Sequence, residues 1–130
     1  MKKNSSIIGI SLIVTSIILG AFAAHGLEKL VSPEKLLSFE TGVKYQMYGG
    51  LALLLVAFND DKFVKSPTWF YRLLLTGVLL FSGSIYLLSL QEVLDMKLKL
   101  LGPITPIGGL FMICAWISLL LSVLSTAKKS

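Results

Sequence analysis

The chain has 130 residues and a net charge of +5, with 55% hydrophobic residues, only 15% charged residues and a mean hydropathy of +0.81. Because soluble domains carry about 25% charged residues, this composition excludes a water-soluble domain. The length suits a single domain, and the apolar residues form four long blocks. The twelve basic residues are scattered at the ends of these blocks and not gathered on one face, which argues against nucleic-acid binding. We therefore expect a small multi-pass membrane protein.

The four apolar blocks predict four transmembrane helices. Residues 7–24 carry no charge over 18 positions, enough to cross a hydrocarbon core about 30 Å thick. Lys2 and Lys3 before this block, with Ala21-Phe22-Ala23 in it, also resemble a secretory signal with its cleavage site, but the block exceeds a signal core and predicts an uncleaved helix. The second block is shorter, and a full span must include Lys44, whose ammonium can reach the headgroups. The expected spans are about 6–24, 40–58, 68–90 and 104–126 of one transmembrane domain.

The breaks between the blocks carry helix-start signals. A hydroxyl residue followed by proline predicts an N-cap with proline at the first helical position. Three such pairs are present: Ser32-Pro33, Ser66-Pro67 and Thr105-Pro106. Residues 27–38 predict a short amphipathic segment on the membrane surface, and residues 91–103 predict a second interfacial connector. The expected fold class is all-α, an integral membrane four-helix bundle with short interfacial amphipathic connectors.

The distribution of basic residues predicts the orientation. Four spans place both termini on the same side of the membrane. That side collects seven of the twelve basic residues, and the opposite side collects five. Cytoplasmic segments carry an excess of Lys and Arg, so both termini are expected in the cytoplasm, with the chain in the plasma membrane. The seven residues are Lys2, Lys3, Lys62, Lys65, Arg72, Lys128 and Lys129.

Small residues recur at four-residue spacing in the first and fourth spans and predict flat helix faces. Lipid tails are as apolar as leucine, so spans associate through close contact of small residues. The candidate packing residues are Ser16, Gly20, Ala24, Gly83, Ser118 and Ser122. These faces serve either packing within the bundle or self-association. Cys114, in the same series, is expected to be an inert residue of the core.

A few polar residues near the outer ends of the first two spans form the candidate site. His25 ends the first span, and the topology brings it to the depth of Thr41, Tyr45 and Gln46. This cluster predicts either hydrogen-bonding between the first two spans or a headgroup or small polar ligand site, and His25 can also be a plain helix-end residue. No catalytic motif and no Cys or His cluster is present in the sequence, so we expect no enzyme, cofactor or metal site.

Four further residues are expected to have structural roles: Glu40, Lys44, Tyr86 and Trp116. Glu40 lies four residues before Lys44, the better orientation for a helical ion pair, which is expected to steady the entry of the second span. Tyr86 and Trp116 are expected to be packing or interfacial residues.

Four segments, one in or near each predicted span, have a distinctive sequence: LGAFAAHGL at 19–27, TGVKYQMY at 41–48, LFSGSIY at 80–86 and ITPIGG at 104–109. Together they resemble the signature blocks of the domain of unknown function 423 family, small bacterial membrane proteins related to a eukaryotic small transmembrane protein family. The resemblance implies a four-helix integral membrane protein, with no established activity, cofactor or catalytic residue. His25, Thr41, Tyr45 and Gln46 match the family pattern. Gly49 stands where the family usually has a second histidine, which argues against a mechanism with paired histidines.

Three functions are compatible with the sequence. The first is a non-enzymatic protein that supports membrane integrity or serves as an accessory or scaffold protein. The second is a small oligomeric transporter or channel, although the span centres lack the ionisable residues of an ion pathway. The third is a lipid-headgroup binding or lipid-acting protein that uses His25, Glu40, Tyr45 and Gln46. The expected partners are membrane lipids and either a second copy or another membrane protein, with no nucleic acid.

Overall fold

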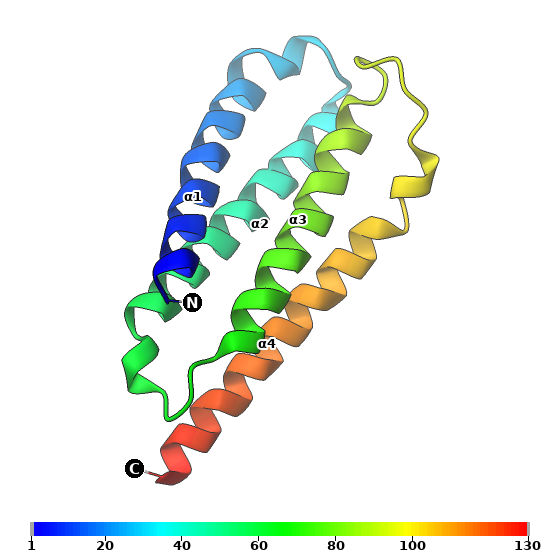
Figure 1. Cartoon of the computed structure of the whole chain (residues 1–130). Coiled ribbons are helices and arrows are strands. Elements are labelled where there is room, and N and C mark those ends of the chain that lie inside the picture. The colour runs from blue at the N-terminus through cyan, green and yellow to red at the C-terminus, as the bar shows by residue number, and fades with distance from the viewer. Residues whose placement is uncertain (1, 130) are drawn as a thin grey trace.

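The computed structural model describes residues 2–129 and confirms the all-α fold, with no strand in that range. Short 3₁₀ turns and loops join four long helices. Figure 1 shows that successive helices run antiparallel. Both termini lie at the same end of the bundle as the α2–α3 connection. The helices are α1 (Lys2–His25), α2 (Pro33–Phe58), α3 (Thr68–Leu90) and α4 (Ile104–Lys129), and the turns are η1 (Leu27–Lys29), η2 (Asp60–Lys62) and η3 (Lys99–Leu101).

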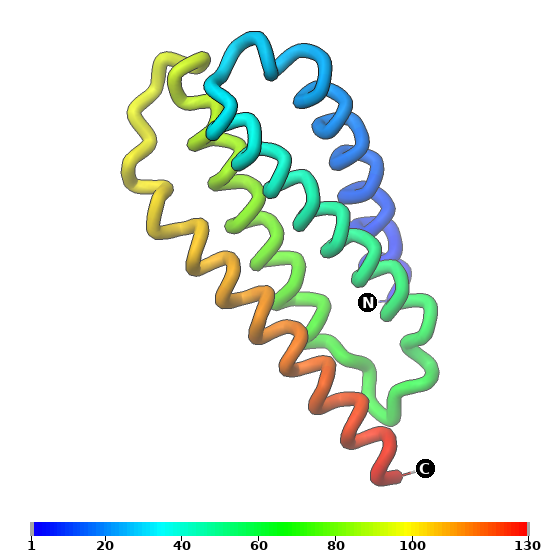
Figure 2. The backbone as a smooth tube through the Cα atoms, turned by 180° about the vertical axis from the view of Figure 1, so that it is seen from behind, coloured from blue at the N-terminus to red at the C-terminus, as the bar shows by residue number. Residues whose placement is uncertain are grey.

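The bundle is open, with each helix packed mainly against its neighbour in chain order. Helices α2 and α3 lie in the middle, and α1 and α4 flank them on opposite sides (Figures 1 and 2). The main core joins the inner faces of α2 and α3 to the first half of α4. Its buried residues are Ala52, Leu53, Val56, Ala57, Phe70, Tyr71, Leu74, Val78, Met112 and Ala115.

Three helical segments are long and apolar enough to cross a membrane: Lys2–Lys29, Thr68–Leu90 and Lys99–Lys129. The outer faces of α1 and α4 are exposed and apolar, as expected of surfaces that contact lipid tails. Helix α2 does not meet the same hydropathy criterion, although its 26 residues reach roughly 39 Å at about 1.5 Å per residue. Its lower hydropathy comes from residues such as Lys44 and Gln46, and the second of these is buried inside the bundle.

Two pairs of glycines lie at close backbone contacts between helices. A Cβ added to Gly9 of α1 would lie 2.8 Å from the carbonyl oxygen of Gly50 in α2, and the reverse distance is also 2.8 Å. Gly77 of α3 and Gly108 of α4 stand in the same relation at 2.9 Å. Real Cβ atoms do not approach oxygen so closely, so both interfaces depend on the absence of a side chain. This is the close backbone approach expected of membrane helices.

Of the small residues predicted for packing in α1, two lie at the interface with α2 and one is exposed. Ser16 is buried, and a Cβ on Gly20 would lie 3.4 Å from Val43, so both lie at the α1–α2 interface. Ala24 is exposed, whereas its neighbour Ala23 is buried. At 100° per residue, position i+8 is turned about 80° away from position i, whereas position i+7 is turned by only about 20°. The buried series on α1 therefore follows Gly9, Ser16 and Ala23.

In the third and fourth spans, too, the residues predicted for packing are not the fully buried ones. A Cβ on Gly83 would meet nothing within 4 Å. Ser118 and Ser122 are half-buried and donate hydrogen bonds to carbonyls of their own helix. The expectation that Cys114 belongs to the core is wrong, because its side chain is exposed. Helix α4 buries Gly108, Met112 and Ala115 instead.

The structure confirms one of the three predicted helix starts. The Lys35 N–H donates to Ser32 Oγ at 3.4 Å, and Pro33 is the first residue of α2. Residues 33–38 belong to this continuous helix, so the prediction of a separate surface segment over 27–38 is wrong for that part. Capped at Ser32, the helix continues without a break to Phe58.

The other two helix starts are wrong in detail. Ser66 donates its hydroxyl proton to Asp60 at 2.8 Å instead of capping, and α3 begins at Thr68, one residue after Pro67. Helix α4 begins at Ile104, so Thr105 is already its second residue. The Thr105 hydroxyl lies 2.5 Å from Ser84 Oγ of α3. In both cases the hydroxyl bonds a residue outside the helix that it was expected to cap, and this bond competes with the local cap.

Candidate functional site

The buried amide of Gln46 connects three helices. Its side chain projects from α2 and is 5% exposed. Its Nε2 donates to Thr15 Oγ1 at 2.6 Å and to the Leu12 carbonyl at 3.0 Å, both on α1. Its Oε1 accepts a hydrogen bond from the Tyr86 hydroxyl of α3 at 2.6 Å. Because hydrocarbon offers no partners to polar groups, such bonds have to be made within the protein.

The α2–α3 contact beside this amide is shaped around Tyr86. The Tyr86 ring packs against Phe39, with ring centroids 4.8 Å apart. A Cβ on Gly42 would lie 2.8 Å from Tyr86 Cε1, so glycine makes room for the ring. The Ser82 hydroxyl donates to the Gly42 carbonyl at 2.7 Å. We call Thr15, Gln46, Ser82 and Tyr86 the polar network.

A cavity of about 280 Å³ lies over the polar network, between α1 and α3. The polar groups that line it are already bonded within the chain. Both protons of the Gln46 amide are used, and the Thr15 hydroxyl donates to the Ser11 carbonyl at 2.8 Å. The cavity is thus lined by satisfied donors, which suits a network that holds helices together.

The four candidate site residues do not meet. Within residues 2–129 no hydrogen bond or ion pair joins any two of His25, Thr41, Tyr45 and Gln46. His25 is exposed at the end of α1. The Thr41 hydroxyl donates to the Leu37 carbonyl of its own helix at 3.0 Å. Tyr45 and Gln46, adjacent in sequence, point about 100° apart around the helix, so they cannot share one face.

Tyr45 belongs to an aromatic surface on the other side of α2. Its ring lies 5.7 Å from Tyr48 and 4.9 Å from Phe81, centroid to centroid. These three rings line a largely apolar cavity of about 500 Å³ between α2, α3 and α4, with Met112 and Trp116 on its α4 side. Of the predicted cluster, only Gln46 therefore connects the first two spans.

The position where the family pattern has a second histidine is closely packed. Gly49 of α2 faces Val78 of α3, and a Cβ at this position would overlap Cγ2 of Val78. The Val78 side chain therefore packs directly against the backbone of α2. A histidine at position 49 does not fit this arrangement of α2 and α3.

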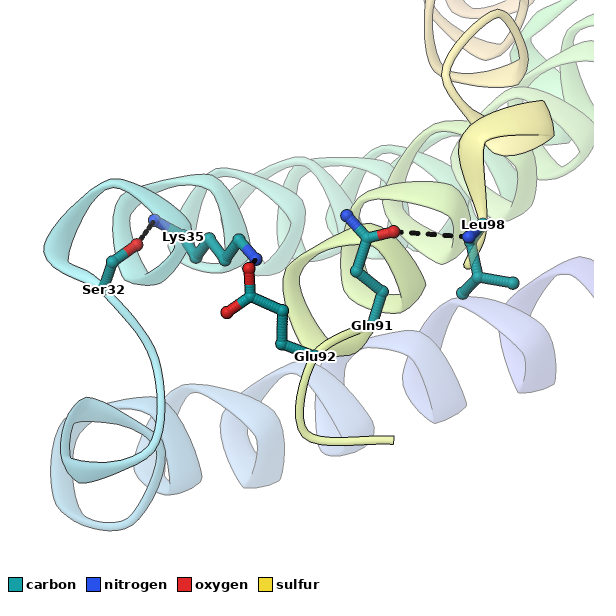
Figure 3. A network of polar contacts seen from close by, with 5 residues as sticks. All are labelled: Ser32, Lys35, Gln91, Glu92 and Leu98. Atoms are coloured by element: carbon teal, nitrogen blue, oxygen red, sulfur yellow. Dashed lines mark hydrogen bonds and ion pairs between the residues drawn. The ribbon is translucent and has the colours of Figure 1, made fainter. Parts of the chain in front are cut away.

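Several polar contacts were not expected from the sequence. Tyr86, expected to be a packing or interfacial residue, is a hydrogen-bond donor to Gln46. The predicted pair of Glu40 and Lys44 is not formed within residues 2–129. The ion pair found there joins Lys35 Nζ of α2 to Glu92 Oε1 just after α3, at 2.6 Å (Figure 3).

The opposite end of the bundle has its own polar contacts. The Tyr71 hydroxyl of α3 donates to Asp60 Oδ1 at 2.6 Å, and Ser66 donates to the same atom at 2.8 Å. The Val64 N–H donates to Thr126 Oγ1 at 3.2 Å, which ties the loop to α4. Within residues 2–129, no group of three His, Cys, Asp or Glu side chains could hold a metal ion.

The chain is similar to known proteins over most of its length. Residues 19–109 match the family described as protein of unknown function (DUF423). The UPF0382 membrane protein SH2409 of Staphylococcus haemolyticus is 40% identical over 116 residues, 89% of this chain and 91% of the relative. The UPF0382 membrane protein YwdK of Bacillus subtilis is 42% identical over 106 residues, 80% and 82% of the two chains.

The similarity extends to a fungus. The UPF0382 membrane protein C1782.12c of Schizosaccharomyces pombe is 42% identical over 106 residues, 81% of this chain and 88% of the relative. No solved structure matches the chain. These matches confirm the resemblance inferred from the four sequence segments: the chain belongs to the DUF423 family of membrane proteins, whose function is unknown.

Proposed function

We propose that this chain is a non-enzymatic accessory or scaffold protein that supports membrane integrity. The observation that supports this role is the polar network, in which the groups that face the cavity between α1 and α3 already have hydrogen-bond partners within the chain. An ion pathway requires charged or unsatisfied polar groups near the bilayer centre. No charged side chain occurs from 73 to 90 or from 104 to 127, and Lys44 of α2 is exposed and lies outside the network.

The same proposal includes four crossings of the plasma membrane with both termini in the cytoplasm. Helix α2 packs along α1 and α3, runs antiparallel to both, and is long enough to cross with them. Gln46 is turned into the bundle, so it does not face lipid. The end that holds both termini and the α2–α3 loop carries seven of the twelve basic residues, which favours the cytoplasm for that end.

Two assays test this role. In the host cell, removal of the chain is expected to increase leakage of a membrane-impermeant dye, and the wild-type chain is expected to restore the barrier. His25→Ala and Glu40→Gln are expected to restore it equally, because neither side chain belongs to the polar network. Purified chain in liposomes is expected to give no flux of Na⁺, K⁺ or H⁺ above that of empty liposomes.

Each alternative makes a contrary prediction in these assays. Cells that lack the chain without leaking would contradict the role in membrane integrity. If His25→Ala fails to restore the barrier at wild-type abundance in the membrane, the lipid-acting alternative is favoured. Ion flux through the reconstituted chain would favour a transporter or channel.

A further inference from the structure

A second polar cavity lies at the opposite end of the molecule from the two termini. It has a volume of about 350 Å³ and lies between α2, the last turns of α3 and the start of α4. It shares no lining residue with the cavity over the polar network. Its lining residues are Lys35, Ser38, Thr41, Ile85, Leu88, Ser89 and Thr105.

Ser89 in this cavity lacks a hydrogen-bond partner. Its side chain is 3% exposed, and its Oγ has no partner among residues 2–129. Buried polar groups are nearly always paired, and a helical serine commonly bonds a carbonyl one turn earlier. The other hydroxyls of the cavity are all paired: Ser38 and Thr41 donate to the Glu34 and Leu37 carbonyls one turn earlier, at 3.2 and 3.0 Å, and Thr105 is bonded to Ser84. Ser89 is therefore an unsatisfied group in the wall of a cavity, which indicates a missing partner.

The cavity also contains a cation with an exchangeable partner. The Lys35 side chain is 25% exposed, and its ammonium has three protons to donate. Figure 3 shows the ammonium directed at Glu92, whose side chain is 78% exposed. Glu92 lies outside the set of lining residues, so an anion inside the cavity can replace it as the partner of Lys35 without leaving a buried charge.

The helices add to the positive potential of this region. Both α2 and α4 begin at this end of the molecule, and helix N-termini carry a positive partial charge. Thr105 is the second residue of α4, so the first turn of that helix borders the cavity. The apolar residues Ile85 and Leu88 complete the wall on the α3 side.

We propose that this cavity binds a phosphate group through the Lys35 ammonium and the Ser89 hydroxyl. Phosphate oxygens accept hydrogen bonds from ammonium and hydroxyl groups, and a charged acceptor strengthens these bonds. The phosphate belongs either to a lipid headgroup, whose chain then contacts Ile85 and Leu88, or to a free phosphate ion. This inference goes beyond the proposed scaffold role and does not depend on it.

Binding is measured on the full chain, delipidated in an uncharged maltoside detergent, by native mass spectrometry and by the shift of its melting temperature. The probes are a short-chain phosphatidylglycerol, a diacylglycerol of the same chain length and inorganic phosphate. We expect saturable binding of a phosphate-bearing probe and none of the diacylglycerol. Saturation by phosphatidylglycerol alone supports the site with a lipid as its source, and equal saturation by inorganic phosphate supports it with a free ion.

Four variants separate this site from general attraction to anions. Lys35→Gln is expected to weaken binding about tenfold and Ser89→Ala about threefold, because the first removes a charged donor and the second an uncharged donor to the phosphate. Glu92→Gln is expected to strengthen binding about threefold, because a competing carboxylate is removed. Lys44→Gln, at an exposed lysine of the same helix, is the matched control and is expected to leave binding unchanged.

The opposite signs of Lys35→Gln and Glu92→Gln are the decisive result. If the two residues form only a structural ion pair, both variants shift the melting temperature of the free chain alike, and neither changes binding. The proposal is overturned by that outcome, by equal losses in Lys35→Gln and Lys44→Gln, or by the absence of saturable binding in the wild type. The melting temperature without ligand shows that each variant is folded, and the result is independent of the dye-leakage assay.

Discussion

At the scale of single residues, the buried amide of Gln46 depends strongly on hydrogen bonds to neighbouring helices. It is nearly fully buried, and it makes hydrogen bonds to α1 and to α3. Removal of one partner leaves the atom that it bonded without a hydrogen bond, in a medium that offers no replacement. The contribution of this amide is therefore expected to depend on Tyr86.

A double-mutant cycle tests this dependence. Tyr86→Phe is expected to lower the free energy of unfolding by about 1 kcal/mol, the net value of one hydrogen bond. Gln46→Leu is expected to lower it by about 2 kcal/mol, because three hydrogen bonds are lost and Tyr86 is left unpaired. The double variant is expected to lose less than the sum, since both changes remove the same bond. Unfolding of the purified chain in mixed micelles gives all three values.

The matched control is Tyr45→Phe. The Tyr45 hydroxyl makes no hydrogen bond within residues 2–129, and the side chain is 42% exposed, so this variant is expected to unfold like the wild type. Strictly additive losses at Gln46 and Tyr86 would show that the two side chains act separately.

At the scale of helices, the two outer interfaces use the same device. Gly9 and Gly50 bring α1 and α2 into backbone contact, and Gly77 and Gly108 do this for α3 and α4. A methyl group at these positions would clash with backbone atoms of the facing helix. Such a clash cannot be relieved by a change of side-chain rotamer. Gly83 differs, because the space beside it is open.

Alanine substitutions distinguish the two kinds of glycine. Gly50→Ala and Gly108→Ala are each expected to lower the free energy of unfolding by about 2 kcal/mol or more, through overpacking at a backbone contact. Gly83→Ala is expected to leave it unchanged or raise it by up to about 1 kcal/mol, because alanine favours the helix. Thermal unfolding in detergent measures the three variants. Equal stability of Gly108→Ala and Gly83→Ala would contradict the role of close backbone contact.

At the scale of the whole molecule, the crossing of α2 determines the topology. If α2 crosses the membrane, the α1–α2 and α2–α3 connections lie on opposite sides. Lys29 and Lys62 mark these connections, and both are exposed. The excess of basic residues near the termini predicts that Lys62 lies on the cytoplasmic side.

Cysteine labelling tests this arrangement in a Cys114→Ser background. A membrane-impermeant maleimide is expected to label Lys29→Cys in intact cells and Lys62→Cys only after permeabilisation. Labelling of both positions from the same side would show that α2 does not cross. The reverse pattern of labelling would show that the termini lie outside.

The class of the molecule could be predicted from the amino-acid sequence alone. Four apolar blocks in a chain with so few charges predict membrane helices, because hydropathy and length are properties of consecutive residues. The Ser32 cap followed for the same reason, since its partner Lys35 is three residues away. The four family segments could also be recognised in the sequence, and the comparisons confirmed the family.

Which residues of different helices contact one another could not be predicted from the sequence. Spacing within one helix predicted a small-residue series through Ala24, but the register between helices selected Ala23 and the pairs of Gly9 with Gly50 and Gly77 with Gly108. Tyr86 lies 40 residues from Gln46, and the cavity beside Ser89 is formed by residues of α2, α3 and α4. Such contacts depend on the rotation and the depth of each helix relative to the next, which are set by packing across the bundle and not by neighbours along the chain.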